Sequence, residues 1–86
     1  MEKDFRGYSA RIVQANKAAS ATHPGVRLGR LCIAKEIPVS DVAEFFGVTR
    51  MTIYKWFKGV EQPRKQHLEK IGETIAKFKN AESLGR

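Results

Sequence analysis

Residues 39–58, VSDVAEFFGVTRMTIYKWFK, decide the fold, because they predict two short helices joined by a tight turn. Gly47 stands between the helices and accepts the positive φ that a turn of about three or four residues requires. We expect Ser40 to cap the first helix, and the second to begin near Thr49 and end before Gly59. Apolar or small side chains predict the packed face of this pair: Val42, Ala43, Phe46, Val48, Ile53, Trp56 and Phe57.

The second helix of this pair is expected to keep one face exposed. At about 100° per residue, a helix with Ile53, Trp56 and Phe57 inward presents another set of side chains outward. That set is Met51, Tyr54, Lys55 and Lys58, with Arg50 at the amino end. A helix of this width fits the major groove of DNA, where long basic side chains suit guanine edges and phosphates, and apolar groups suit thymine methyls.

The same stretch resembles a known family, the Cro-like and phage-repressor helix-turn-helix proteins. The residues that carry the resemblance run from Leu28 to Phe78: Ala43, Gly47, Val48, Ile53 and Trp56 in the helix pair, Gly59, Pro63, Leu68, Ile71 and Ile75 after it, and Leu31 and Ile37 before it. The resemblance implies an all-α, lambda-repressor-like domain of four to five helices. It places this domain at residues 23–80, between a partly helical extension at residues 1–22 and a tail at residues 81–86.

The resemblance also implies which side chains contact DNA. Thr49, Arg50, Met51, Tyr54 and Lys55 would face base edges, and Lys58, Arg64 and Lys65 would hold the sugar–phosphate backbone. Many members of the family have Gln where this chain has Val39, so we expect a backbone N–H near Ser40 to replace that phosphate contact. Arg64 and Lys65 open a helix, where positive charge opposes the helix dipole, and this small cost favours a functional reason for them.

Three further helices are predicted outside this pair. One covers Tyr8–Ala21 behind a Ser9 cap, with Tyr8, Ile12, Ala15 and Ala19 on one stripe. Another covers Val26–Lys35, with Thr22 as a possible cap and Pro38 preventing its continuation. The last carries Leu68, Ile71, Ile75 and Phe78 on one face, and Phe78 is open to either a core or a dimer contact. No segment has comparable support as a strand.

Composition restricts the function classes. With 86 residues the chain has room for one modest core, and its net charge of +7 and pI of about 9.9 favour a polyanionic partner. Residues 49–70 hold six basic and two acidic residues, a net +4. Cys32 is the only cysteine, which suits a reducing cytoplasm, and no apolar stretch approaches a membrane span. His23 and His67 are isolated and no Ser, His and Asp grouping occurs, so we expect no enzyme, metal or cofactor.

The leading hypothesis is sequence-specific binding of double-stranded DNA by a small phage or bacterial transcriptional repressor that reads the major groove with residues 49–58. By analogy with the family we expect a homodimer on a palindromic site, and no small-molecule effector because the chain lacks room for a sensing domain. Two alternatives stay open. One is an accessory DNA-binding protein of recombination or packaging, and the other is a basic protein-interaction module that inhibits a host protein.

Overall fold

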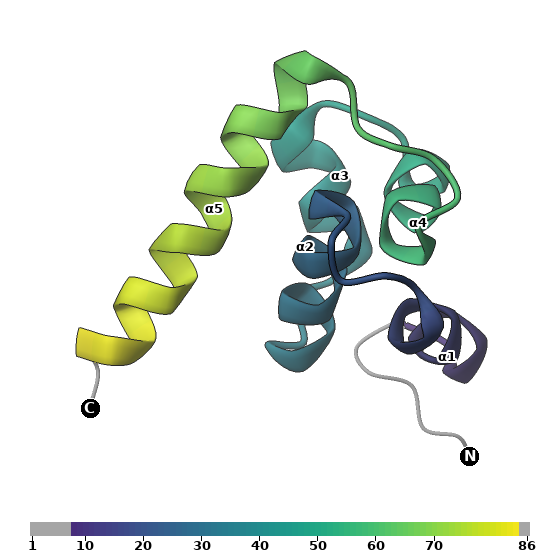
Figure 1. Ribbon diagram of the computed structural model, residues 1–86, viewed down its shortest axis with the longest axis horizontal. Coiled ribbons are helices and arrows are strands. Elements are labelled where there is room, and N and C mark those ends of the chain that lie inside the picture. The colour runs from purple at the N-terminus through teal and green to yellow at the C-terminus, as the bar shows by residue number, and fades with distance from the viewer. Residues whose placement is uncertain (1–7, 85–86) are drawn as a thin grey trace.

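The computed structural model describes the backbone of residues 8–84 and side chains up to residue 79. Over this range the chain forms five α-helices and no strand, which confirms the expected all-α class (Figure 1). The helices are α1 (Ala10–Ala18), α2 (Pro24–Ala34), α3 (Val39–Phe46), α4 (Arg50–Lys58) and α5 (Lys65–Leu84). None of these helices is both long enough and apolar enough to cross a membrane.

Short-range signals in the sequence set several helix ends. The Ile12 N–H donates to Ser9 Oγ (3.3 Å) at the start of α1, so the expected Ser9 cap is confirmed. At the start of α4 the Thr52 N–H donates to Thr49 Oγ1 (3.2 Å). Gly47 and Gly59 end α3 and α4 with φ of 70° and 74°, a left-handed conformation that glycine adopts without a Cβ clash.

Other helix ends differ from the prediction. α1 is shorter than Tyr8–Ala21, because Ser9 is its cap and Ala19 already has an extended backbone. α2 begins at Pro24, whose fixed φ suits a first helical position, so the cap is His23 and not Thr22. α3 begins at Val39, with Pro38 in the capping position.

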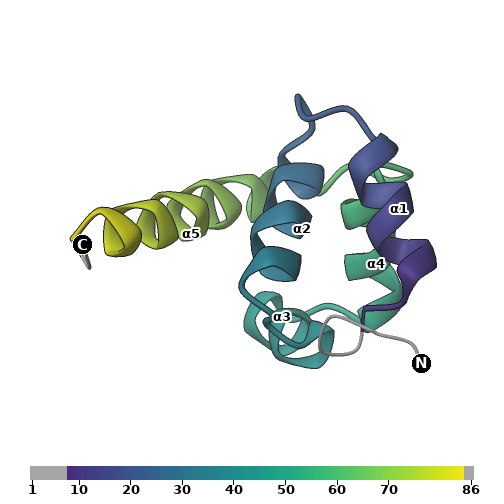
Figure 2. The same cartoon turned by 90° about the horizontal axis from the view of Figure 1, so that it is seen from below.

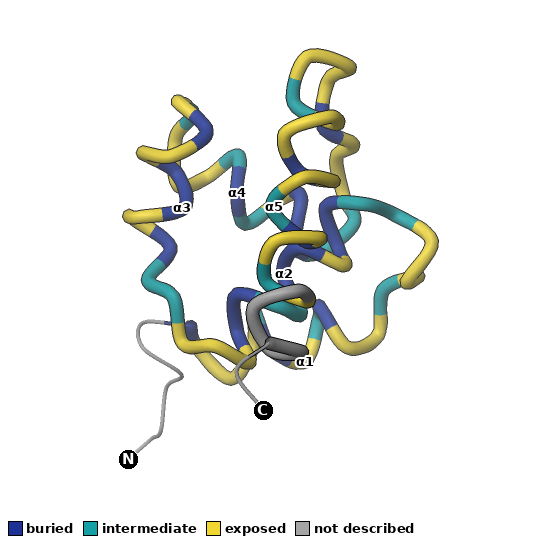
Figure 3. The backbone as a smooth tube through the Cα atoms, turned by 90° about the vertical axis from the view of Figure 1, so that its left-hand side faces the viewer, coloured by how far each residue is buried: buried dark blue, intermediate teal, exposed yellow. Residues whose placement is uncertain are grey.

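Ser40 was therefore wrongly predicted as the cap of α3. The Pro38 carbonyl accepts from the N–H groups of Asp41 (3.0 Å) and Val42 (3.2 Å), so the helix is already under way at Val39. Ser40 is an exposed residue of the first turn. Along the rest of α3, buried and exposed positions alternate as expected for an amphipathic helix (Figure 3).

The core lies where α2, α3, α4 and α5 meet, and it contains the side chains predicted from the α3–α4 stretch. Trp56 packs edge-on against Phe46, with ring centroids 5.7 Å apart, and lies 5.3 Å from the His67 ring. Leu68 does not lie on the packed face of α5, although the sequence predicts that it shares one face with Ile71 and Ile75. It is exposed because His67, one residue earlier, takes the inward position in the first turn of α5, ahead of the buried Ile71 and Ile75.

Two glycines let α2 pack very closely on α4. A Cβ added at Gly25 would lie 2.9 Å from the Cβ and the carbonyl oxygen of Trp56. A Cβ added at Gly29 would lie 2.7 Å from Asn16 Nδ2 and from Phe57 Cγ. Both positions therefore exclude any larger side chain unless the helices move apart.

The amino-terminal helix belongs to the same core. Asn16 is buried, and its Nδ2 donates to the carbonyl oxygens of Val26 (3.1 Å) in α2 and Phe57 (2.8 Å) in α4. Tyr8, just before α1, is fully buried with its ring 5.9 Å from the Phe57 ring. Arg30 Nη2 donates to the last carbonyls of α1, at Asn16, Lys17 and Ala19. α1 thus lies against α2 and α4, whereas the far half of α5 projects away from the bundle (Figure 2).

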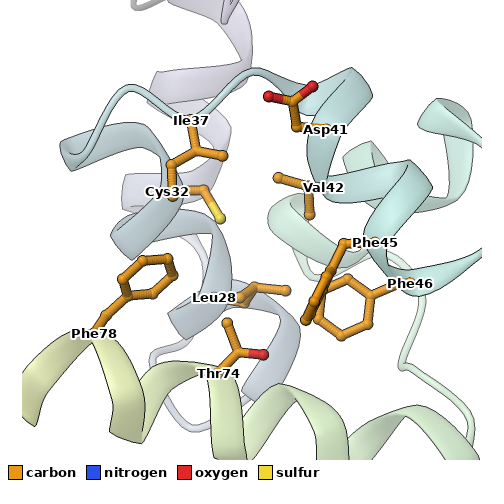
Figure 4. A pocket seen from close by; sticks show the side chains of 9 residues that line it. All are labelled: Leu28, Cys32, Ile37, Asp41, Val42, Phe45, Phe46, Thr74 and Phe78. Carbon is orange, nitrogen blue, oxygen red and sulfur yellow. The ribbon is translucent and has the colours of Figure 1, made fainter.

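An apolar pocket of about 240 Å³ separates part of α5 from α2 and α3 (Figure 4). Cys32, Phe45 and Phe78 line it from three different helices, and Phe78 is half-buried there. The Asp41 carboxylate lies at its edge. Burial raises the pKa of the Cys32 thiol to about 12, so this side chain is an inert part of the core.

Candidate nucleic-acid interface

α4 presents one exposed face on a helix whose other face is in the core. Ile53, Trp56 and Phe57 are buried, as the helical spacing predicts. Arg50, Met51 and Lys55 are exposed, and Met51 retains 63% of its accessible surface despite being apolar. The cap at Thr49 fixes where the helix begins, so the Arg50 side chain leaves from the first turn.

The five residues predicted to read bases divide into two groups. Arg50, Met51 and Lys55 extend outward from the helix. Thr49 also serves the fold, because its hydroxyl caps the helix and lies 3.1 Å from the Thr52 hydroxyl. Tyr54 is half-buried and packs against the hydrophobic core, so only part of its ring is available to a ligand.

Lys55 carries an ion pair that the sequence did not reveal. Its Nζ lies 3.7 Å from Glu61 Oε1, and both side chains remain about half exposed. The N–H groups of Val60 (3.0 Å) and Glu61 (3.3 Å) donate to the Lys55 carbonyl, which folds the loop back over the end of α4. Glu61 is six positions from Lys55, beyond the spacing of helical ion pairs, so only the loop geometry brings it there.

The residues predicted to hold the DNA backbone lie at three places. Lys58 is half-buried at the end of α4, and Arg64 and Lys65 are exposed at the start of α5. Arg64 and Thr52 both line a polar cavity of about 400 Å³, so Arg64 lies on the same side of α4 as Thr52. Ser40 lies apart from them, at the end of α3 that is distant from the connection to α4.

One basic residue of the 49–70 window is engaged elsewhere. Lys70 Nζ donates to the Phe45 carbonyl (2.7 Å) and lies 4.3 Å from the centre of the Phe45 ring. This interaction connects α5 to α3 and engages the Lys70 ammonium group at Phe45. Within the 49–70 window, the positive charge around α4 therefore comes from Arg50, Lys55, Lys58 and the pair Arg64 and Lys65.

The arrangement offers basic and apolar groups on an exposed surface. In the part of the chain that the structure describes, no three His, Cys, Asp or Glu residues come together as metal ligands. Comparison with protein-family models, with curated proteins and with solved structures found no match for this chain. α3, α4 and the residues beside them form the candidate interface.

Proposed function

We propose that this protein binds double-stranded DNA in a sequence-specific manner, with α3 and α4 acting as a helix-turn-helix and α4 entering the major groove. The observation that carries the proposal is the exposed face of α4, where Arg50, Met51 and Lys55 extend from a helix held on its other side by a buried Trp56. The tight α3–α4 connection supports it, since Gly47 adopts the left-handed conformation that such a turn uses.

In this proposal base recognition falls mainly to Arg50 and Lys55. A guanidinium at the amino end of the helix can donate two hydrogen bonds to O6 and N7 of one guanine. Lys55 must exchange its partner Glu61 for DNA, and Met51 offers an apolar surface to a thymine methyl. Lys58, Arg64 and Lys65 would contact phosphates, and the Ser40 N–H in the first turn of α3 would donate to another.

We further propose a biological role as a small phage or bacterial repressor that works in the cytoplasm as a homodimer on a palindromic site. This part rests on the resemblance of residues 28–78 to the helix-turn-helix family. A dimer would place two α4 helices about one turn of DNA apart, so the selected site should show two half-sites with that spacing. Light scattering with and without DNA would report the stoichiometry.

The proposal is tested by selecting bound sequences from a random duplex pool and measuring affinity for single-base variants of the selected site. Arg50→Ala should keep the helix content, because Arg50 lies outside the core. It should reduce the preference for the selected site about tenfold to a hundredfold, concentrated at one or two base pairs per half-site. Lys79→Ala removes the same charge from exposed α5 and should leave the preference unchanged.

Two outcomes would contradict this assignment. A uniform loss of affinity across all base variants would make Arg50 a phosphate contact and move base recognition to the other residues of α4. Failure of the native protein to retain any duplex at low salt would favour the basic protein-interaction module instead, because a phosphate-binding surface retains duplex under those conditions.

A further inference from the structure

A second segment of the chain, outside the 49–70 window, also carries a large share of the positive charge. Residues 8–35 contain no Asp or Glu, and they carry +5 of the total +7. Residues 36–86 hold nine basic and seven acidic residues, a net +2. The basic residues of the acid-free segment are Arg11, Lys17, Arg27, Arg30 and Lys35. An uninterrupted run of one sign over two helices creates a positive field that attracts polyanions.

Two of these basic residues do not contribute to the surface around α4. Arg30 is used within the fold, because its guanidinium donates to the carbonyls at the end of α1. Arg27 lies two residues from both Gly25 and Gly29, the positions at which α2 touches α4. Since two residues turn a helix by about 200°, Arg27 points away from α4.

Two further charges, Arg11 and Lys17, lie exposed on α1, and the structure fixes α1 beside α4. Asn16 is hydrogen-bonded to the Phe57 carbonyl, and Tyr8 packs on the Phe57 ring. At the other end of α1, the Ala19 Cβ lies 3.3 Å from the site of a Cβ on Gly59. α1 therefore lies against the carboxyl end of α4, at Phe57 and Gly59, and the two ribbons lie together in Figure 2.

α1 and the start of α5 lie on opposite sides of the exposed face of α4. Tyr54 faces the α1 side, because it lies only about 60° around the helix from Phe57, whose ring packs on Tyr8. Thr52 faces the other side, where it shares a polar cavity with Arg64. Thr52 and Tyr54 are two residues apart on one helix and so point in roughly opposite directions.

Resting on the proposed DNA binding, we propose that α1 is a second phosphate-binding element, in which Arg11 and Lys17 contact the DNA strand on the opposite side of the major groove from Arg64 and Lys65. A helix that lies in the groove has a phosphate backbone on each side. Basic groups on both flanks of α4 match that arrangement. The segment outside the resemblance would then carry part of the binding affinity, without contributing to base recognition.

The test measures the affinity of the full chain for a duplex as a function of KCl concentration, by fluorescence anisotropy. The variants are Arg11→Gln, Lys17→Gln and the double variant. Arg27→Gln is the matched control, since it removes the same charge from the acid-free segment on the side away from α4. Circular dichroism verifies that each variant keeps the native helix content.

We expect the slope of log affinity against log salt to become less steep by about 0.9 for each phosphate that is no longer neutralised, so by roughly one to two units in the double variant. Affinity should fall about equally for selected and random duplexes, and Arg27→Gln should keep the native slope. A native slope in the double variant, or an equal change in Arg27→Gln, would overturn the inference while leaving the DNA binding by α4 intact.

Two other results separate the inference from the proposed function. If the native protein retains no duplex at low salt, the proposed function fails and the inference with it. If the double variant binds duplex as the native protein does but no longer binds vesicles of anionic phospholipid, the α1 charges serve a membrane surface and the inference is wrong.

Discussion

At the scale of single residues, Asn16 shows that one buried polar side chain can connect its helix to two others. The expected stripe of Tyr8, Ile12, Ala15 and Ala19 counted apolar positions only. Tyr8 is buried as expected and the other three are partly buried, but the structure also buries Val13 and Asn16. Its amide satisfies two carbonyls on helices that are distant in sequence. Nothing in the local pattern could identify those partners, because they depend on how α2 and α4 pack.

Glu61 provides a test at the scale of a single residue. In the proposed complex it competes with DNA for the Lys55 side chain. We predict that Glu61→Gln tightens binding to random duplex about two- to fivefold, since an exposed ion pair is worth up to about 1 kcal/mol. The variant also removes a negative charge from the interface. Glu73→Gln, on exposed α5, is the matched control and should change affinity less. Weaker binding by Glu61→Gln would show that Glu61 helps to position Lys55 for DNA.

Cys32 provides a pH-dependent prediction. Burial raises the pKa of its thiol to about 12, so the native state holds the proton over a pH range in which the unfolded chain, with a thiol pKa of about 8.5, releases it. The resulting stability is fully present below the unfolded pKa and is lost as the pH rises toward the folded value. Tyr8 acts in the same direction, because its burial also raises its pKa.

We therefore predict a falling melting temperature above about pH 9. At pH 8 the native protein should hold about a thousandfold less Cys32 thiolate than the unfolded chain, so a thiol reagent should label it at the rate of unfolding. Labelling in urea serves as the control. Fast labelling of the native protein at pH 8 would contradict the burial of this thiol.

At the scale of the helices, the sequence predicted ends where one residue decides the backbone and failed where several compete. Gly47, Gly59 and the Ser9 cap are of the first kind. The start of α3 is of the second kind, because Pro38 and Ser40 both suit a capping position and only the observed hydrogen bonds decide between them. The prediction for Leu68 was wrong for a similar reason. The rotation of α5 about its axis places His67, and not Leu68, at the inward position of the first turn.

The close approach of α2 to α4 was not predicted, because glycines within a helical pattern give no indication of a packing partner. We predict that Gly29→Ala lowers the free energy of unfolding by about 1–3 kcal/mol, because its Cβ would overlap Asn16 and Phe57. Gly72→Ala is the matched control. Its Cβ would meet nothing within 4 Å on α5, so it should stabilise the protein by up to about 1 kcal/mol. Equal effects in urea unfolding would contradict the described α2–α4 packing.

At the scale of the whole molecule, the sequence predicted the all-α class and the alternation of inward and outward residues on α4, since both follow from helical periodicity. It also predicted that the basic residues that contact DNA lie between residues 49 and 70, within and after the second helix of the pair. The structure adds that α1 lies beside α4 and shares the core with it, so the acid-free segment also borders the exposed face. This arrangement depends on contacts between distant segments, which periodicity does not encode.

We expect DNA to contact the exposed face of α4, and this surface can be mapped residue by residue. The most direct measurement is a titration of the ¹⁵N-labelled full chain with a short duplex, followed by amide chemical shifts. We predict that the largest shifts occur at residues 49–58 and at Arg64 and Lys65. Amides lining the apolar pocket, such as that of Cys32, should stay nearly unchanged. Large shifts confined to α5 and that pocket, or no shift at low salt, would contradict this prediction.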